Sequence, residues 1–294
     1  MLNVFTVDVE DYFQVSAFER HVDRARWDDF PSRVVENTHR LLRLLDRRQV
    51  QGTFFVLGWV ARRYPELVRS IHAAGHELAS HGFWHRLVYK QTPDEFRRDL
   101  HDSRDAIATA AGVVVTMYRA PSFSITPRSL WALDVLVKEG FTVDASVFPI
   151  RHDRYGLPNA ARSLHRLSTP SGDSIWEFPA STARLMGMNL PTAGGGYFRL
   201  YPWSVTRRLL GRINAGEQQP FMFYTHPWEI DPEQPRVAGP GLRSRFRHYV
   251  NLASTAGKLE RLFETFQFTT LGAAVRKLAT DPACESLESV ECPA

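Results

Sequence analysis

Cysteine is scarce in this sequence: there are two in 294 residues, Cys284 and Cys292, and both lie in the polar C-terminal segment. The body of the chain therefore offers no thiolate as a nucleophile or metal ligand, and no disulfide framework can be inferred. No apolar run approaches the length of a membrane span, and no charged N-terminal region precedes a long apolar segment. These absences predict a soluble cytoplasmic protein without a transmembrane segment.

Dense blocks of one charge are also missing. The formal net charge is +4 and the pI is near 9.2, and the excess positive charge is mostly arginine spread along the chain. This pattern predicts no nucleic-acid partner, because nucleic-acid sites need a clustered basic patch. The hydrophobic fraction of 44% and the charged fraction of 23% are ordinary for a globular protein with a sizeable core.

Short apolar runs alternate with helical patterns along most of the chain. We expect strands at residues 2–7, 52–58, 76–79, 113–118, 141–143, 174–179 and 220–225, and helices at 32–49, 64–75, 93–111, 127–139, 202–214 and 249–265. This alternation predicts parallel βα units in a single α/β domain over residues 1–280. Residues 150–174 and a C-terminal elaboration at about 231–280 are expected to be rich in loops, and 281–294 to form a disordered tail. The glycine run at 194–199 is interpreted as a tight loop or rim, not as a helix start.

Two histidines four residues apart, His81 and His85, follow the expected strand at 76–79. If the chain turns into a helix there, their neutral imidazoles lie on one face and could hold one divalent ion. The alternative is a pair of partly exposed histidines in a loop, which is the more frequent case for an isolated pattern of this kind. A metal site is favoured because charged residues and histidines also end the other apolar runs, as a site at one face of an α/β barrel requires.

Three carboxylates, Asp8, Glu10 and Asp11, follow the first apolar run. Side chains at i and i+2 of a strand share a face, so Glu10 is expected to point into the same pocket as Asp8. Asp11 is the alternative carboxylate ligand if the strand has already turned. Two histidines and one carboxylate with open positions suit Zn²⁺, and also Fe²⁺, Co²⁺ or Ni²⁺.

Five short motifs occur in this order: Asp8-x-Glu10, His81-x-x-x-His85, Arg119-Ala120-Pro121, Asp144-Ala145-Ser146 and His226. Together they resemble the motifs of the polysaccharide deacetylases, known as the NodB homology or carbohydrate esterase family 4. Residues 6–13 and 224–229 most resemble the subgroup encoded with exopolysaccharide gene clusters of the PEP-CTERM/exosortase type. The first motif departs from the family pattern of two adjacent aspartates, because Val9 follows Asp8.

The resemblance implies a distorted (β/α)7-type barrel that removes N-acetyl groups from amino sugars with one divalent metal, most often zinc. It implies a general base at Asp8, an arginine at Arg119 that pairs with this base, and a proton donor at His226. We expect Asp144 to be the acidic residue that orients His226. The implied metal ligands are Glu10, His81 and His85, with Asp11 as the alternative to Glu10.

Aromatic residues near these motifs are candidates for a sugar-binding wall. The predicted substrate-binding residues are Trp84, Pro121, Phe123 and Trp228, and the wall also has Phe83, Phe148 and Trp176 as candidates. Aromatic side chains are usually buried for their area, so at least half of these are expected to be ordinary core residues.

The expected function is therefore deacetylation of an N-acetylated glycan or its lipid-linked precursor, in exopolysaccharide biosynthesis. The mild positive charge is compatible with peripheral association with the inner membrane, although a solvated arginine-rich face is the favoured explanation of it. Two alternatives have different chemistry. One is an amidohydrolase of a small cyclic amide, similar to allantoinases, and the other is a catalytically inactive glycan-binding module.

Overall fold

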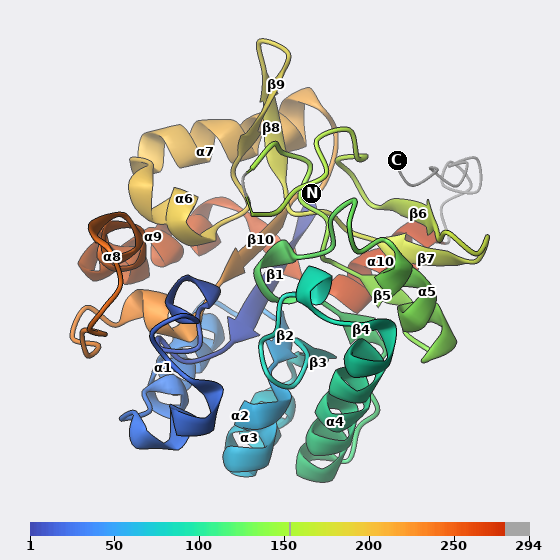
Figure 1. Ribbon diagram of the computed structural model, residues 1–294. Coiled ribbons are helices and arrows are strands. Elements are labelled where there is room, and N and C mark those ends of the chain that lie inside the picture. Colours follow the sequence, from blue (N-terminus) through green and yellow to red (C-terminus); the bar gives the residue numbers. More distant parts are fainter. Residues whose placement is uncertain (153, 280–294) are drawn as a thin grey trace.

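The computed structural model describes residues 1–152 and 154–279. Its centre is a curled, mostly parallel sheet that forms a half-barrel (Figure 1). The strands, in the order in which they pair, are β10 (Met222–Thr225), β1 (Leu2–Val9), β2 (Thr53–Val56), β3 (Glu77–Ser80), β4 (Met117–Tyr118), β5 (Val143–Asp144), β7 (Ser174–Glu177) and β6 (His165–Ser168). The short strand β11 (Gln267–Thr269) also pairs with β1, and β6 alone is antiparallel to its neighbour. The predicted distorted α/β barrel is thus confirmed.

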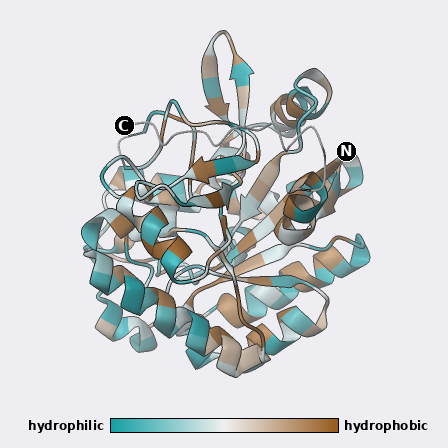
Figure 2. Cartoon of the chain, turned by 90° about the vertical axis from the view of Figure 1, so that its right-hand side faces the viewer, coloured by the Kyte–Doolittle hydropathy of each residue, from teal (hydrophilic) through white to brown (hydrophobic). Residues whose placement is uncertain are grey.

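Helices pack around this sheet. They are α1 (Val34–Arg47), α2 (Gly58–Arg63), α3 (Pro65–Ala73), α4 (Pro93–Ala111), α5 (Trp131–Lys138), α6 (Gly195–Leu200), α7 (Trp203–Gly211), α8 (Leu242–Tyr249), α9 (Leu252–Thr265) and α10 (Leu271–Ala279). Along the outer helices, hydrophilic and hydrophobic stretches alternate, as expected when one face meets the core (Figure 2). No helix in the described part of the chain is long and apolar enough to cross a membrane.

Local sequence explains where the longest helix begins and ends. The Thr92 side chain accepts from the backbone of Glu95 while the Glu95 carboxylate accepts from the backbone of Thr92, which is a capping box at the start of α4. Pro93 occupies the first turn, where its missing N–H is not needed. Gly112 then ends the helix in the left-handed conformation, with φ of 71°. The predicted helix at 93–111 therefore has the correct bounds.

Several elements differ from the sequence-based expectations. The strand expected at 113–118 is reduced to its last two residues, and the expected helix at 64–75 is preceded by the separate short helix α2. The loop expected at 150–174 contains strand β6. The hairpin of β8 (Thr182–Leu185) and β9 (Met188–Pro191) was not predicted, and it protrudes at the top of Figure 1. The tail at 281–294, with Cys284 and Cys292, lies outside the described residues.

The interpretation of the glycine run as a loop without a helix start is wrong, because α6 begins there. Gly194 has φ of 128° and pairs in parallel with Tyr224 of β10. A Cβ atom at this position would lie 1.9 Å from the Tyr224 carbonyl oxygen, so only glycine fits. The glycine run lets the chain pass closely along β10 and sets the position from which α6 carries Arg199 toward the site described below.

Candidate active site

Polar residues from the carboxyl ends of neighbouring parallel strands meet in one pocket. Asp8 and Glu10 come from the end of β1, His81 follows β3, and His226 follows β10. Parallel strands place such residues along the same edge of a sheet, which is where barrel enzymes build their sites. The pocket has a volume of about 200 Å³.

Asp8 is fixed by a buried arginine. Arg119 Nη1 donates to Asp8 Oδ1 at 2.7 Å and to Thr6 Oγ1 at 2.8 Å, and its Nε donates to the Ala145 carbonyl at 3.2 Å. The guanidinium also lies over the ring of Phe55, 4.1 Å from its centroid. The predicted pairing of Arg119 with Asp8 is therefore confirmed. This buried ion pair fixes the direction of the carboxylate and leaves Oδ2 of Asp8 for the pocket.

Glu10, His81 and His85 form the candidate metal centre. One ligand atom of each lies within 4.8 Å of the other two, and all three side chains are buried. His81 Nδ1 donates to the Arg119 carbonyl at 2.9 Å, which leaves Nε2 as the electron-pair donor. Burial lowers the pKa of His81 to about 4, so its imidazole is neutral near pH 7, as a ligand must be.

The contacts inside this triad fit a bound cation. Glu10 Oε2 is buried without a hydrogen bond and lies 2.7 Å from His85 Nε2. Burial opposes the charged form of Glu10, but the contacts with His85, His226 and His81 hold its pKa below the usual range. A carboxylate that stays ionised beside two buried imidazoles needs positive charge between them, which a divalent metal supplies. The residues present therefore fit the predicted metal.

The two histidines do not meet on a helix, so the expected helical arrangement is wrong. Residues 81–87 form a loop, in which Gly82 has φ of 72° and His85 φ of 50°. The Asp99 carboxylate of α4 accepts from the backbone of Phe83 at 2.8 Å and of Trp84 at 3.2 Å, and this fixes the loop. A Cβ at Gly82 would lie 2.6 Å from Asp99 Oδ2, so the glycine permits this turn.

Asp11, the alternative ligand, is used elsewhere. Its carboxylate accepts from the Ser32 hydroxyl at 2.6 Å and from the backbone of Tyr12, Arg33 and Val34, at the start of α1. It therefore caps a helix and is not part of the metal cluster. Glu10 is the carboxylate of the site, as the i, i+2 spacing with Asp8 predicts.

His226 lies in the pocket beside Asp8 and Glu10. Its Nε2 is 3.9 Å from Asp8 Oδ2 and 3.5 Å from Glu10 Oε1, and its ring stacks on Trp228 with centroids 5.0 Å apart. The Trp228 indole N–H donates to Glu10 Oε1 at 3.1 Å. The imidazole is thus directed at the space between the base candidate and the metal centre.

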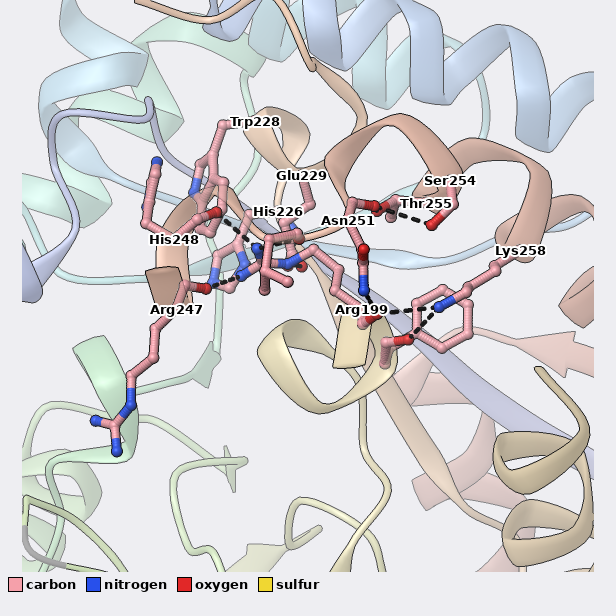
Figure 3. A network of polar contacts seen from close by, with 12 residues as sticks. Arg199, His226, Trp228, Glu229, Arg247, His248, Asn251, Ser254, Thr255 and Lys258 are labelled. Carbon is pink, nitrogen blue, oxygen red and sulfur yellow. Dashed lines mark hydrogen bonds and ion pairs between the residues drawn. The ribbon is translucent and has the colours of Figure 1, made fainter. Parts of the chain in front are cut away.

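The acidic partner of His226 is Glu229, so the expectation that Asp144 orients this histidine is wrong. His226 Nδ1 donates to Glu229 Oε1 at 2.5 Å, and Arg199 Nε donates to Glu229 Oε2 at 2.8 Å. Arg199 is buried and also donates to the backbone carbonyls of Arg247, His248 and Val250 (Figure 3). Burial alone would lower the pKa of His226, but the hydrogen bond and the charges of Glu10, Glu229 and Asp8 raise it to about 9. The histidine is therefore held as a protonated acid near pH 7.

The Glu229→Gln variant is expected to move the alkaline limb of the turnover–pH profile to lower pH. A hydrogen bond to a charged group contributes about 1.5–3 kcal/mol, which corresponds to about 1–2 pKa units. Removing it lowers the pKa of His226, so the proton donor is lost at lower pH. The profile of kcat from pH 6 to 10 measures this shift. The unfolding temperature of the variant shows whether the protein stays folded when Arg199 loses the Glu229 carboxylate. An unshifted alkaline limb in a folded variant would exclude this role for Glu229.

Asp144 instead belongs to a buried pair of carboxyl groups. It is the neighbour of Glu177 in the sheet register, and both side chains are buried. Asp144 Oδ1 accepts from the Ser146 hydroxyl at 2.5 Å, and the Ser146 oxygen accepts from the backbone of Ala120, next to Arg119. Burial and the adjacent Asp144 raise the pKa of Glu177 well above its usual range, so the pair holds one proton. Asp144 thus supports the arginine motif and does not contact His226.

The Glu177→Gln variant is expected to be more stable than the wild type at pH 8 and to depend less on pH. The stability contributed by a raised carboxyl pKa is complete below the ordinary pKa and is lost as pH rises through the raised one. Glutamine keeps an N–H donor beside Asp144 without taking up a proton. We expect a gain in the free energy of unfolding of about 1 kcal/mol or more at pH 8, because each pKa unit corresponds to about 1.4 kcal/mol.

Urea unfolding at pH 5 and pH 8 measures this effect, with the exposed Glu260→Gln as the matched control. Parallel pH curves for wild type and Glu177→Gln would contradict the shared proton.

Two of the predicted substrate-binding residues line the pocket and two do not. Phe123 and Trp228 line the pocket. Among the described residues, the pocket lining does not include Trp84 or Pro121. Trp84 packs against Trp27 instead, with ring centroids 5.9 Å apart. The sequence reasoning missed other lining residues, which come from several separate segments of the chain: Ser16, Arg154, Tyr155, Arg199, Tyr224 and Arg247. No local signal marks them.

A strained turn forms one wall. Ser122 and Phe123 are consecutive non-glycine residues in the left-handed region, with φ of 53° and 52°. Such residues are uncommon and persist where the surrounding structure fixes them, often at functional sites. The turn places the Phe123 ring against Tyr224 and Phe148, with centroid distances of 5.0 Å and 5.3 Å. In the segment after Arg119, Phe123 therefore forms part of an aromatic wall of the pocket, whereas Pro121 does not line it.

The pocket thus brings together a triad of candidate metal ligands, a carboxylate fixed by an arginine and an imidazole fixed by a second carboxylate. Comparison with known proteins adds a family. Residues 25–141 match a family model described as polysaccharide deacetylase, and residues 145–276 match one described as a domain of unknown function, DUF3473.

Two curated relatives agree with this match. A peptidoglycan-N-acetylglucosamine deacetylase of Bacillus cereus is 30% identical over 158 residues, which cover 50% of this chain and 55% of the relative. A chitooligosaccharide deacetylase of Rhizobium leguminosarum bv. trifolii is 28% identical over 113 residues, which cover 38% and 48%. The chain thus spans about half the length of these relatives. The matched part of the chain is thus similar to polysaccharide deacetylases.

The fold comparison covers more of the molecule. A crystal structure described as that of a candidate polysaccharide deacetylase from Mycobacterium smegmatis matches with a TM-score of 0.64 and 20% sequence identity. The match covers 99% of this chain and 93% of that one, so it includes the region after residue 145. It shows that the fold is shared along the whole described chain.

Proposed function

We propose that the protein is a metal-dependent deacetylase that hydrolyses the N-acetyl amide of amino sugars in a polysaccharide or its lipid-linked precursor. One observation carries this proposal. A carboxylate fixed by Arg119 and an imidazole fixed by Glu229 face one another across the candidate metal ligands, within a single pocket. Amide hydrolysis needs these three functions together, because a water must be activated, the carbonyl polarised and the leaving amine protonated.

Each residue has a part that follows from its contacts. Glu10, His81 and His85 would hold the metal, which when bound supplies a Lewis acid for the acetyl carbonyl and lowers the pKa of water to about 7. Asp8 Oδ2 takes the proton of the attacking water, because Oδ1 is occupied by Arg119. His226 Nε2 donates a proton to the departing amine, while Glu229 holds the opposite ring nitrogen.

We propose Zn²⁺ as the metal, with Co²⁺, Ni²⁺ or Fe²⁺ as alternatives that the same ligands accommodate. Two neutral imidazoles and one carboxylate, with open positions for water and substrate, are typical of catalytic zinc sites. Elemental analysis of protein purified without added metal identifies the ion that the cell supplies.

Acetate release decides between the proposed activity and its alternatives. The deacetylase should release acetate from N-acetylglucosamine oligomers and leave a cyclic ureide intact. Ring opening of the ureide without acetate release would favour the amidohydrolase, and metal binding with neither reaction would favour a glycan-binding module. The presence of base, acid and ligands in one pocket favours the first outcome, because a binding module needs no such set.

The biological setting is a further part of this proposal. The resemblance of residues 6–13 and 224–229 to the exopolysaccharide-associated subgroup supports action on a growing glycan in the cytoplasm, with peripheral association with the inner membrane. Deletion of the gene should then raise the N-acetyl content of the exported polymer, and fractionation should recover the protein with cytosol or inner membrane. An unchanged N-acetyl content would contradict this setting without affecting the proposed chemistry.

A further inference from the structure

Two arginines at the mouth of the pocket have no acidic partner. Arg154 and Arg247 both line the pocket, and neither forms an ion pair with a carboxylate of the described residues. The other charged lining residues are accounted for: Asp8 pairs with Arg119, Arg199 pairs with Glu229, and Glu10 belongs to the metal centre. Within residues 1–152 and 154–279, the two arginines therefore bring positive charge to the pocket that no carboxylate neutralises.

Arg154 is held in place by two serines from other loops. Its Nη2 donates to Ser16 Oγ at 3.0 Å, and Ser16 Oγ lies 2.7 Å from Ser122 Oγ. Ser122 belongs to the strained turn that also positions Phe123 in the pocket wall. The guanidinium is thus fixed beside the aromatic wall with donors left over for a ligand, since it has five N–H groups in all.

Arg247 lies on α8 and also lines the pocket. Its backbone carbonyl accepts from Arg199 Nη2 at 2.9 Å, which ties this part of α8 to the buried network around Glu229. The side chain extends away from that network (Figure 3) and is exposed. Burial raises the pKa of the Tyr155 hydroxyl, and the charges of Arg247 and Arg154 both oppose this rise. Arg154, Arg247 and Tyr155 all line the same pocket, so the two charges lie around one shared space.

Like charges brought together without a counter-ion repel each other, and the arrangement becomes favourable when an anion binds between them. A guanidinium matches the geometry of a carboxylate or phosphate with two parallel hydrogen bonds. We propose that Arg154 and Arg247 form an anion-binding subsite at the mouth of the pocket, so that the preferred substrate is an acidic glycan with a carboxylate or phosphate close to the N-acetylated sugar. This inference rests on the proposed deacetylase function.

The test compares acidic and neutral glycans of equal length. The neutral probe is the N-acetylglucosamine tetramer, and the acidic probe is a hyaluronan tetrasaccharide, in which N-acetylglucosamine alternates with glucuronate. Calorimetry measures binding and acetate release measures kcat/KM, both on the full chain with metal bound. N-acetylglucosamine 1-phosphate, added as a competitor, distinguishes a phosphate from a carboxylate as the preferred anion.

We expect the wild type to bind the acidic tetrasaccharide at least about tenfold more tightly than the neutral one, as one strong charged hydrogen-bonding pair allows. Arg154→Gln and Arg247→Gln should each reduce this preference about tenfold at most, and the double variant should abolish it. The matched control is Arg245→Gln, an exposed arginine of the same helix that does not line the pocket. Its preference should equal that of the wild type.

The outcomes separate the subsite from the deacetylase function. Equal affinity of the wild type for both probes overturns the subsite, as does an equal loss in Arg245→Gln and Arg247→Gln, which would indicate only a general surface charge. Tight and arginine-dependent binding of the acidic probe without acetate release supports the subsite and contradicts the deacetylase. Unfolding temperatures of the variants verify that each is folded.

Discussion

The Asp8→Asn variant is expected to retain its metal and to lose about 10²–10⁴-fold in turnover, the usual effect of removing a general base. Asparagine has the shape of aspartate but cannot accept the proton of the attacking water. Arg119 keeps its hydrogen bonds to Thr6 and Ala145, so the buried guanidinium retains two of its partners. The loss should therefore lie in kcat, and elemental analysis should find the wild-type metal content.

The Glu10→Gln variant is the matched comparison for this prediction. It removes the negative charge from the candidate ligand triad, so metal content should fall along with turnover. If Asp8→Asn loses the metal and Glu10→Gln keeps it, the two carboxylates have the opposite roles. The structure argues against that outcome, because Asp8 Oδ1 is engaged by Arg119 whereas Glu10 Oε2 receives no hydrogen bond.

The double variant His81→Ala/His85→Ala is expected to lose both activity and nearly all bound metal. It removes two of the three candidate ligands and leaves a single carboxylate, which cannot hold a transition metal tightly. Acetate release should fall to background, and the metal content measured by elemental analysis should fall from about one ion per chain to near zero.

The control for this loss is His72→Ala, which removes an exposed histidine from the surface of α3. It should keep both metal and activity. Full metal occupancy in the folded double variant would remove His81 and His85 from the site, and circular dichroism of the same sample establishes that it is folded.

Local rules predicted the parts of the site that are close together in sequence. The i, i+2 spacing along a strand placed Asp8 and Glu10 on one face, and both point into the pocket. The meeting of parallel strand ends explains why His81, Arg119 and His226 converge although they are far apart in the chain. The order of the five motifs carries the resemblance to polysaccharide deacetylases, because no single motif is specific enough on its own.

Such rules could not predict the residues whose place in the site depends on tertiary contacts. Glu229, the partner of His226, lies only three residues after it, whereas the expected partner Asp144 lies beside Glu177 in the structure. Arg199 lies in a helix that begins in a glycine run, and its partners come from the turn after β10, from α8 and from the residue after α8. Its burial depends on four acceptors that no sequence period reveals.

The histidine pair shows the same limit in another form. The spacing of His81 and His85 suggested a helix, whereas a loop with Gly82 and His85 in the left-handed region brings them together. That loop depends on Asp99, a residue of α4 whose carboxylate accepts the loop's backbone donors. Sequence spacing predicted the right ligands, but the conformation that unites them is set by this distant contact.

The most direct test of the metal-dependent deacetylase is to follow bound metal and acetate release in one titration. Metal-stripped protein is loaded with increasing Zn²⁺ and assayed on the neutral and acidic N-acetylated tetrasaccharides together. We expect acetate release to rise in proportion to bound metal and to saturate at about one ion per chain. Saturation of the site without acetate release, or acetate release that does not depend on bound metal, would contradict the proposal.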